Sequence, residues 1–484
     1  MMQPGLLARM SALAFAAALA NCATNPVTGN PNLVTMSEAQ EVAIGRGEDP
    51  KVRQRYGVYP DAALQDYVTE VGRRLASRSH RPELDYQFLV VDSPEVNAFA
   101  LPGGYVYITR GLMAYLSSEA ELAAVLGHEL GHVTARHAVQ QLSAAAAASV
   151  GATVLQIFVP QARGILGDTA VGLLGNALLS GYGRDHELEA DRLGAEYLAR
   201  TGYDARAMVS VVGVLKNQEL FDAEVAQQEG RAPRRYHGVF ASHPDNDTRL
   251  QQVVTEAGRY QAADARAGHE EYLRRLDRMV YADSPSQGVV RGNRFYHAEF
   301  GIAFEFPAGW RVRNQARNVS ATSAAQDALI DLRLAGEAKG SPADVLRRVA
   351  RLGAGSDIAP TSIGGLPAAI AMTSMSGRPT RVAVVFHGGR AYAIGAQARS
   401  SDLFSQYERE FDASIASFHE LTQAERRLAR PLALRVITAQ PGLTFAELAR
   451  VSPLGRNAEG HLRVLNGMYP KGEPVAGQAL KIVE

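Results

Sequence analysis

Residues 121–137 read ELAAVLGHELGHVTARH, an apolar stretch that carries three histidines and, next to the first of them, a glutamate. On a helix, residues four apart share a face, so His128 and His132 can direct both imidazoles to one point. Neutral imidazole is a good zinc ligand. Glu129 lies about 100° round the helix from His128, so it can reach a metal-bound water without binding the metal itself. This H-E-x-x-H pattern predicts half of a metal site; the alternative is two hydrogen-bonded core histidines.

The helix that carries this pattern is predicted to be amphipathic and to span residues 117–145. Ser117 or Ser118 would begin it, with Glu121 at the third helical position, as in a capping box. His137 follows His132 by five residues, which places it about 140° round the helix and off the ligand face. We therefore do not expect His137 to bind the metal.

A catalytic zinc site needs three protein ligands and an open position. The candidate for the third ligand lies in residues 182–199, YGRDHELEADRLGAEYLA. Glu187 and Asp191 are four apart and share a helix face, whereas Glu189 points elsewhere. A solvated acidic face is the ordinary interpretation of such a cluster, but beside an H-E-x-x-H helix we interpret it as the remainder of the site.

Together, EAELAAVLGHELGHVTARH and GRDHELEADRLG resemble the zinc metallopeptidases of the HtpX, BepA and CAAX prenyl protease type. These are gluzincins whose third ligand is the first Glu of an E-x-x-A-D motif. The resemblance implies His128, His132 and Glu187 as ligands of one Zn²⁺ per chain. It also implies Glu129 as the base that takes a proton from the attacking water, and Asp191 as the residue that holds a ligand histidine in one tautomer.

The resemblance continues in NPVTGNPN, in NAFALPGGYVYITRGL (97–112) and in SHPDNDTRL (242–250), and departs at Gly183, where the family has Ser. It implies that His243 lies near the oxyanion or the metal and that Arg249 organises the site. His243 could instead be a capping or surface residue, or an inhibitory fourth ligand. The segment Ala98 to Tyr107 resembles the family's edge strand, which pairs with an extended substrate.

The N-terminus has the layout of a secretory signal: Arg9, an apolar run from Met10 to Ala20, then small and polar residues. The only cysteine, Cys22, follows directly, so residues 1–22 resemble a signal peptide with a lipobox. Asn21 departs from that pattern, and cleavage that yields a soluble periplasmic protein is the alternative. Lipidation of Cys22 followed by Ala23 would imply the outer membrane.

Formal net charge is zero and the pI is near 7.2, so no basic field favours nucleic acid as a partner. The chain is long enough for two or three domains. We predict an α+β protein: a mainly helical zincin-type metallopeptidase domain with a small edge-strand sheet (30–285), then an α+β accessory domain (292–422). Helices are expected at 36–47, 62–77, 117–145, 165–202, 205–228 and 246–280, with strands at 88–91 and 105–109.

From about residue 292 the pattern alternates, and a hairpin is predicted across Gly388 and Gly389. Residues 430–484 read strand, helix, helix, strand and resemble a LysM module, which implies peptidoglycan binding through 432–484. Leu443 replaces the usual Asp of that motif. Four histidines of this third have no ligand spacing and are interpreted as structural or surface residues: His297, His387, His419 and His461.

Residues 144–180 are apolar but are interrupted by Pro160, Arg163 and Asp168, so they predict no clean membrane span. We expect helices around the site or a gating loop. The function indicated is a zinc endopeptidase that removes misfolded or misassembled proteins of the bacterial envelope. The alternatives are a catalytically restrained, chaperone-like lipoprotein and a protein that chiefly binds the envelope.

Overall fold

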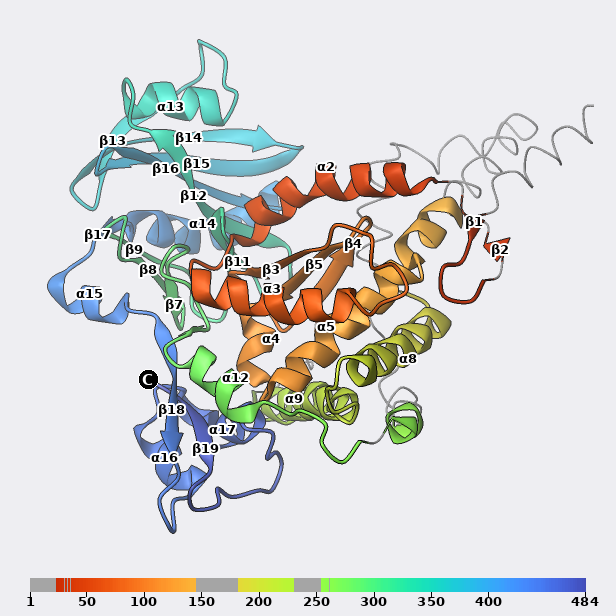
Figure 1. Ribbon diagram of the computed structural model, residues 1–484. Helices are drawn as coiled ribbons and strands as arrows, with labels where there is room; N and C mark the ends of the chain where they lie inside the picture. Colours follow the sequence, from red (N-terminus) through yellow and green to blue (C-terminus); the bar gives the residue numbers. More distant parts are fainter. Residues whose placement is uncertain are drawn as a thin grey trace, which may run out of the picture. The chain divides into compact units, whose positions relative to one another are not determined.

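The computed structural model describes residues 23–29, 31, 32, 34, 36–144, 182–229, 254–260 and 262–484. The chain forms two compact units: Met1–Arg53, Val58–Met279 and Ala433–Glu484 make the first, and Gln54–Gly57 with Val280–Leu432 the second. The described part is α+β, as predicted (Figure 1). Within it, no helix is both long and apolar enough to cross a membrane.

The first unit contains the segment with the H-E-x-x-H pattern, which forms a helix. Its elements, in chain order, are β1 (Ala23–Thr24), β2 (Pro31–Asn32), α2 (Glu38–Tyr56), α3 (Ala62–Ala76), β3 (Gln87–Val91), β4 (Ala98–Leu101), β5 (Tyr105–Thr109), α4 (Arg110–Tyr115), α5 (Glu119–Thr134), α8 (Arg184–Arg200), α9 (Ala207–Glu229), α12 (His269–Leu276), β18 (Leu432–Thr438), α16 (Phe445–Val451), α17 (Ala458–Leu465) and β19 (Ala479–Val483).

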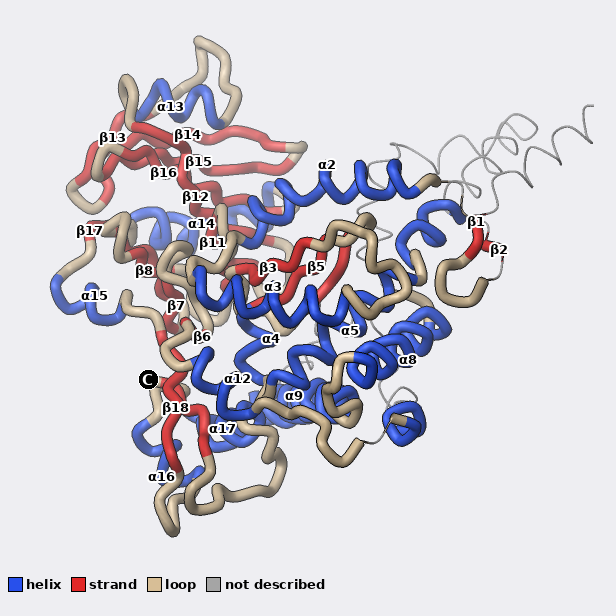
Figure 2. The backbone as a smooth tube through the Cα atoms, viewed as in Figure 1, coloured by secondary structure: helices blue, strands red, loops and turns tan. Residues whose placement is uncertain are grey.

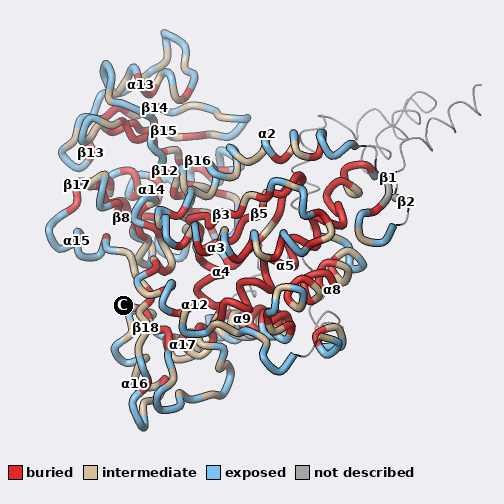
Figure 3. The backbone as a smooth tube through the Cα atoms, viewed as in Figure 1, coloured by how far each residue is buried: buried red, intermediate tan, exposed pale blue. Residues whose placement is uncertain are grey.

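Helix α5 is buried along its whole length, as Figure 3 shows, so the prediction of an amphipathic helix is wrong. A helix covered on all sides is a core helix, and its alanine-rich sequence suits that place. Ser118 is its N-cap, and its hydroxyl accepts a hydrogen bond from Glu121 N. The predicted continuous helix 117–145 is also wrong, because turn residues Ala135 and Arg136 separate α5 from a second helical segment.

Helices α5 and α8 approach closely because small residues face each other between them. A Cβ atom on Gly131 would lie 2.9 Å from the Cα and carbonyl oxygen of Ala190. On the same face, a Cβ on Gly127 would lie 3.4 Å from Gly194 Cα. The two helices that carry the predicted ligands are therefore packed nearly backbone to backbone.

A buried carboxylate holds the N-terminal end of α5. Glu119, 1% exposed, accepts hydrogen bonds from the hydroxyls of Tyr67 (2.9 Å) and Tyr203 (2.7 Å). The Arg266 guanidinium lies 2.9 Å from the same carboxylate. These contacts tie α5 to α3 and to the segments that follow α8 and precede α12.

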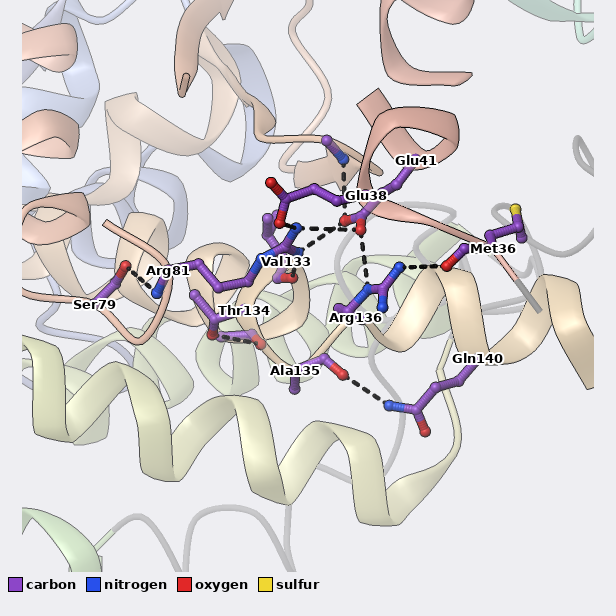
Figure 4. A network of polar contacts seen from close by, with 12 residues as sticks. Met36, Glu38, Glu41, Ser79, Arg81, Val133, Thr134, Ala135, Arg136 and Gln140 are labelled. Carbon is purple, nitrogen blue, oxygen red and sulfur yellow. Dashed lines mark hydrogen bonds and ion pairs between the residues drawn. The ribbon is translucent and has the colours of Figure 1, made fainter. Parts of the chain in front are cut away.

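A second buried carboxylate holds the other end of α5 (Figure 4). Glu41 on α2 accepts hydrogen bonds from Arg81 (2.9 Å) and from Arg136 (3.0 Å). Arg81 also donates to the carbonyl of Val133, one of the last carbonyls of α5, and Arg136 donates to Met36 O. Because both arginines are mostly buried, removing the carboxylate or either guanidinium group would leave a buried charge without a partner and destabilise the fold.

The first unit also contains a small mixed sheet with the order β3-β5-β4, whose strands are labelled in Figure 1 and red in Figure 2. Strand β3 is parallel to β5, and β4 is antiparallel to β5. In the described part of the chain β4 therefore lies at an edge of this sheet. The two predicted strands are confirmed. The predicted edge segment, Ala98 to Tyr107, is right for β4 but wrong for its last residues, because residues 105–107 belong to the central strand β5.

Some predicted helix limits are wrong. Helix α2 continues beyond residue 47 to Tyr56 and includes Pro50. The predicted helix 246–280 is broken in its described part: residues 254–259 are helical, and α12 begins only at His269. Gly268 precedes α12 with φ 71°, a left-handed conformation that ends a helical path.

The C-terminal residues of the first unit have the predicted order of strand, helix, helix and strand, with β18 antiparallel to β19. They contact the rest of that unit through buried polar groups. Lys481 Nζ donates to the carbonyls of Ala114 (2.8 Å) and Leu116 (2.6 Å), at the C-terminal end of α4. His461 Nε2 lies 3.1 Å from the Tyr115 hydroxyl, and burial lowers the pKa of His461 to about 4.

The second unit contains a seven-stranded antiparallel sheet with the order β10-β11-β12-β16-β15-β14-β13, and a four-stranded sheet with the order β17-β9-β8-β7. Its elements are β6 (Val280–Tyr281), β7 (Val289–Arg291), β8 (Arg294–His297), β9 (Ile302–Glu305), β10 (Arg311–Asn314), β11 (Asn318–Thr322), β12 (Ala328–Glu337), α13 (Pro342–Val349), β13 (Ala359–Ile363), β14 (Leu366–Met375), β15 (Arg378–His387), β16 (Arg390–Ala398), α14 (Ser401–Ala416), β17 (His419–Glu420) and α15 (Gln423–Leu428).

Both faces of the seven-stranded sheet are covered. Along β15, Val382 and Val384 pack with residues of α13, whereas Ala383 and Val385 pack with residues of α14. This alternation is the period of two that a strand imposes. The predicted hairpin is confirmed: Gly388 and Gly389 join β15 to β16 and both have positive φ, as such a two-residue turn requires.

Candidate metal centre

Three buried side chains from two helices converge on one point. His128 and His132 come from α5 and Glu187 from the first turns of α8. The two Nε2 atoms lie 3.1 Å apart. Nε2 of His128 lies 3.5 Å from Oε2 of Glu187, and Nε2 of His132 lies 3.5 Å from Oε1 of the same carboxylate. Glu187 is fully buried and the histidines are at most 6% exposed. Among the described residues this is the group that could hold a metal ion.

The dimensions of this triangle suit a small divalent cation. Ligand atoms at about 2.0 to 2.2 Å from a tetrahedral zinc ion lie about 3.3 to 3.6 Å from one another. The separation of 3.1 Å between the two Nε2 atoms, and the 3.5 Å from each Nε2 to its own oxygen of Glu187, are close to that range. The set of two imidazoles and one carboxylate is also a common one for zinc, and leaves a fourth position open.

Each histidine of the triangle makes a hydrogen bond through Nδ1, the ring nitrogen that faces away from the triangle. Nδ1 of His128 lies 2.7 Å from Oδ1 of Asp191, which is one turn after Glu187. Nδ1 of His132 lies 2.8 Å from Nδ1 of His137. His137 Nε2 in turn lies 3.2 Å from Oε2 of Glu189, and that hydrogen bond lowers the pKa of the Glu189 carboxyl. Both histidines therefore direct Nε2 towards the triangle.

Neither His137 nor Glu189 belongs to the candidate ligand group, but the helix geometry assumed for His137 is wrong. The prediction assumed one continuous helix, in which His137 would lie 140° from His132. The break at residues 135 and 136 redirects the chain, and Arg136 adopts φ 60°. A left-handed residue at a helix end is common at glycine and rare elsewhere, so the arginine gave no sequence signal for this turn.

Glu129 is 2% exposed and lines a cavity together with His128 and Asp191. Ala98, the first residue of the edge strand β4, lines the same cavity, whose other walls are apolar side chains of α4, α5 and α9. A second cavity, lined by His132 and Tyr182, includes Ala100 and Leu101 at the other end of β4. The candidate base and both histidines thus lie beside the edge strand.

Tyr182 is a residue of this centre to which sequence reasoning gave no role. Its ring stacks on the imidazole of His132, with centroids 3.9 Å apart and planes 17° apart. Burial and the carboxylates of Glu129 and Glu187 raise the pKa of its hydroxyl. An aromatic residue just before a helix is too common a feature to have indicated this contact.

Two further residues named from the resemblance, His243 and Arg249, lie outside the described residues, as do Cys22 and the apolar stretch 145–181. Gly183, the residue at which the family pattern departs, is the N-cap of α8 and offers no side chain to cap it. The acidic residues of the first turn, Asp185 and Glu187, suit the positive end of the helix dipole.

The class of protein that this centre resembles is a metallopeptidase: residues 62–257, which include the centre, match the model of Peptidase family M48. The chain is 31% identical over 284 residues to the beta-barrel assembly-enhancing protease of Escherichia coli (strain K12), covering 55% of this chain and 54% of that protein. It is 34% identical over 188 residues to a putative protein of that name from Vibrio cholerae, covering 36% of this chain and 37% of the relative.

It is also 32% identical over 169 residues to the mitochondrial metalloendopeptidase OMA1 of Arabidopsis thaliana, covering 34% of each chain. The chain therefore spans about half, or less, of the length of these relatives. The predicted class of zinc metallopeptidase is confirmed for the domain, and the similarity places α3 to α9 inside it.

Proposed function

We propose that this protein is a zinc-dependent endopeptidase that cleaves misfolded or misassembled proteins of the bacterial envelope. The observation that carries the proposal is the buried triangle of His128, His132 and Glu187 with Glu129 beside it, within residues that match the model of Peptidase family M48. The triangle fits one zinc ion, and the cavity that Glu129 lines reaches the edge strand β4.

The residues have the following proposed roles. Nε2 of His128, Nε2 of His132 and a carboxylate oxygen of Glu187 hold the ion. When bound, zinc polarises a peptide carbonyl and makes a coordinated water acidic, with a pKa towards about 7. Glu129 takes the proton from the attacking water and passes it to the leaving amine. Asp191 keeps His128 in the tautomer whose Nε2 is free to bind.

Substrate would bind as an added strand. Strand β4 lies at the edge of its sheet among the described residues, and cavities beside the centre are lined by residues at both of its ends. We expect an extended peptide to pair with this strand as an added strand. Main-chain pairing needs an unfolded segment, which fits a protease that acts on misfolded chains. His243 and Arg249 are proposed to act near the oxyanion or the metal, with the inhibitory fourth ligand as the alternative role for His243.

The test is degradation of an unfolded model substrate such as reduced, alkylated casein, paired with zinc quantification. Glu129→Gln should keep one zinc per chain yet lose activity by about 100- to 10,000-fold, because it removes a general base. Glu70→Gln on α3, whose side chain is 70% exposed, is the matched control and should behave as wild type.

Full activity in Glu129→Gln would contradict the assigned base. An inactive wild type that binds one zinc would favour the alternative of a catalytically restrained, chaperone-like protein. A wild type without stoichiometric zinc would overturn the metal centre itself. A chain that binds envelope fractions but cleaves nothing would favour the binding function.

The envelope as the place of action is proposed from the N-terminal pattern. A lipid on Cys22 would anchor the protein, at the outer membrane since Ala23 follows; the alternative is a soluble periplasmic protein. The Escherichia coli relative is named for enhancing β-barrel assembly, which supports misassembled envelope proteins as substrates. Mass spectrometry of the mature N-terminus tests the anchor, and an unmodified chain that begins at Asn21 would overturn it.

Peptidoglycan binding by residues 432–484 is proposed from the LysM-like sequence and the order of strand, helix, helix and strand. Because His461 and Lys481 are buried against α4 and the residues after it, the surface left for glycan is the remainder of these elements. Sedimentation of the full chain with purified peptidoglycan tests it, and absence of saturable binding would contradict it.

A further inference from the structure

The two histidines of the metal centre have different hydrogen-bond partners at Nδ1. His128 is held directly by a carboxylate, that of Asp191, at 2.7 Å. His132 is held by another imidazole, that of His137, at 2.8 Å, and only the far side of His137 meets a carboxylate, that of Glu189, at 3.2 Å. His137 is completely buried, so water does not replace either contact.

The positions of the ring nitrogens leave one consistent arrangement of protons. If Nε2 of His132 binds a cation, its Nδ1 carries the hydrogen and donates it to Nδ1 of His137. His137 must then be the tautomer with its hydrogen on Nε2, which donates to the Glu189 carboxylate. Every link in the chain from Glu189 to His132 is thus a donor facing an acceptor, and no other tautomer of His137 satisfies both contacts.

Two further contacts fix the ring of His137: a ring that stacks on its face, and hydrogen bonds that hold the preceding residue, Arg136. His186 stacks on it, with centroids 4.2 Å apart and planes 17° apart. The left-handed Arg136 that turns the chain towards the site is held by Glu41 at 3.0 Å and by the Met36 carbonyl at 2.9 Å. The position of His137 is therefore set by α2 and α8 as well as by its own segment.

We propose that His137 and Glu189 are positioning residues for the metal ligand His132: they fix its tautomer and ring orientation and thereby strengthen metal binding. This inference rests on the proposed ligand role of His132. It predicts that substitutions of different neighbours affect the two ligands: those of Asp191 affect His128, and those of His137 and Glu189 affect His132.

The test is zinc affinity, measured by competition with a chromophoric chelator without any substrate. His137→Phe keeps a buried ring but removes the acceptor, and should weaken zinc binding by about 10- to 100-fold. Glu189→Gln keeps a hydrogen-bond acceptor but loses the charge, and should weaken binding by a smaller factor. His137→Gln restores an acceptor for His132 and should recover part of the affinity lost in His137→Phe.

Glu196→Gln is the control, because Glu196 lies on the same helix α8 and pairs with Arg192 and Arg200 instead. A second readout is NMR of the histidine ring nitrogens in zinc-loaded protein. The Nδ1 proton of His132 should exchange slowly with water and give a signal in wild type. In His137→Phe it should exchange fast, and the signal should disappear. If His137→Phe does not fold, Glu189→Gln decides by the same two readouts.

Equal zinc affinity in wild type, His137→Phe and Glu189→Gln would overturn the proposal, while leaving the endopeptidase proposal intact. Loss of activity in Glu129→Gln with unchanged zinc affinity bears on hydrolysis alone. A wild type that binds no zinc overturns both. The two proposals therefore fail in distinguishable ways.

Discussion

Nδ1 of His128 lies 2.7 Å from Oδ1 of Asp191, and both residues are buried. A carboxylate in this position holds the hydrogen on Nδ1 and leaves Nε2 for a metal ion. We expect Asp191→Asn to weaken zinc binding by about 10- to 100-fold, because the neutral amide binds the ring hydrogen less strongly. Chelator competition measures the effect. Asp185→Asn, an exposed residue of the same helix, is the control, and equal affinity in both variants would contradict the role of Asp191.

The close packing of α5 on α8 predicts that Gly131→Ala damages the metal centre without touching a ligand. The added Cβ would lie 2.9 Å from the backbone of Ala190, so the helices must separate. We expect a loss of about 1 to 3 kcal/mol in the free energy of unfolding and weaker zinc binding, since His132 moves away from Glu187. Urea denaturation and chelator competition measure the two effects.

Gly213→Ala on α9 is the control for that substitution, because nothing lies within 4 Å of its added Cβ. It should stabilise the protein by about 1 kcal/mol through helix propensity and leave zinc affinity unchanged. A Gly131→Ala variant as stable as wild type would show that α5 and α8 can separate without cost.

The ion-pair network at the C-terminal end of α5 predicts that Glu41→Ala is strongly destabilising (Figure 4). It leaves the guanidinium groups of Arg81 and Arg136 buried without their carboxylate. Breaking a buried pair in this way costs about 3 to 5 kcal/mol, measured by chemical denaturation.

Glu38→Ala is the matched control, because Glu38 contacts the same Arg81 but its side chain is 65% exposed. A surface ion pair contributes at most about 1 kcal/mol. If Glu38→Ala and Glu41→Ala lower the free energy of unfolding by the same amount, burial would not explain how the network stabilises the protein.

The buried Lys481 predicts a particular dependence of stability on pH. Burial lowers the pKa of Lys481 from 10.5 to about 7, in opposition to the nearby Glu121 carboxylate. Between pH 7 and 10.5 the unfolded chain therefore binds a proton at this lysine that the folded chain does not. The free energy of unfolding should rise with pH in that window, by up to about 1.4 kcal/mol per pH unit from this residue.

Guanidinium denaturation at pH 7, 8 and 9 measures the slope. Lys481→Met should remove this contribution to the slope, whereas Lys471→Met, at an exposed position of the same C-terminal segment, should keep it. Identical slopes in wild type and Lys481→Met would refute the lowered pKa.

Features set by local patterns could be predicted from the sequence. Residues four apart share a helix face whatever surrounds them, so His128 with His132, and Glu187 with Asp191, lie together as expected. The Gly388–Gly389 hairpin and the Ser118 cap follow from turn and cap chemistry in the same way. The identity of each functional side chain within these motifs needs no long-range information.

Local patterns do not report how separate segments meet. The helix break at Arg136 depends on Glu41, 95 positions earlier in the chain, and it is this break that brings His137 behind His132. The burial of α5 on all sides and the stacking of Tyr182 likewise depend on contacts with other elements.

By itself, then, the sequence determined the chemistry of the centre: two imidazoles, two carboxylates and a base at helical spacing. Only the tertiary structure decided the distances between the ligand atoms, because these depend on how closely Gly131 lets α5 approach α8. It also decided which neighbours orient the ligands, since hydrogen bonds between distant segments exist only once the chain has packed.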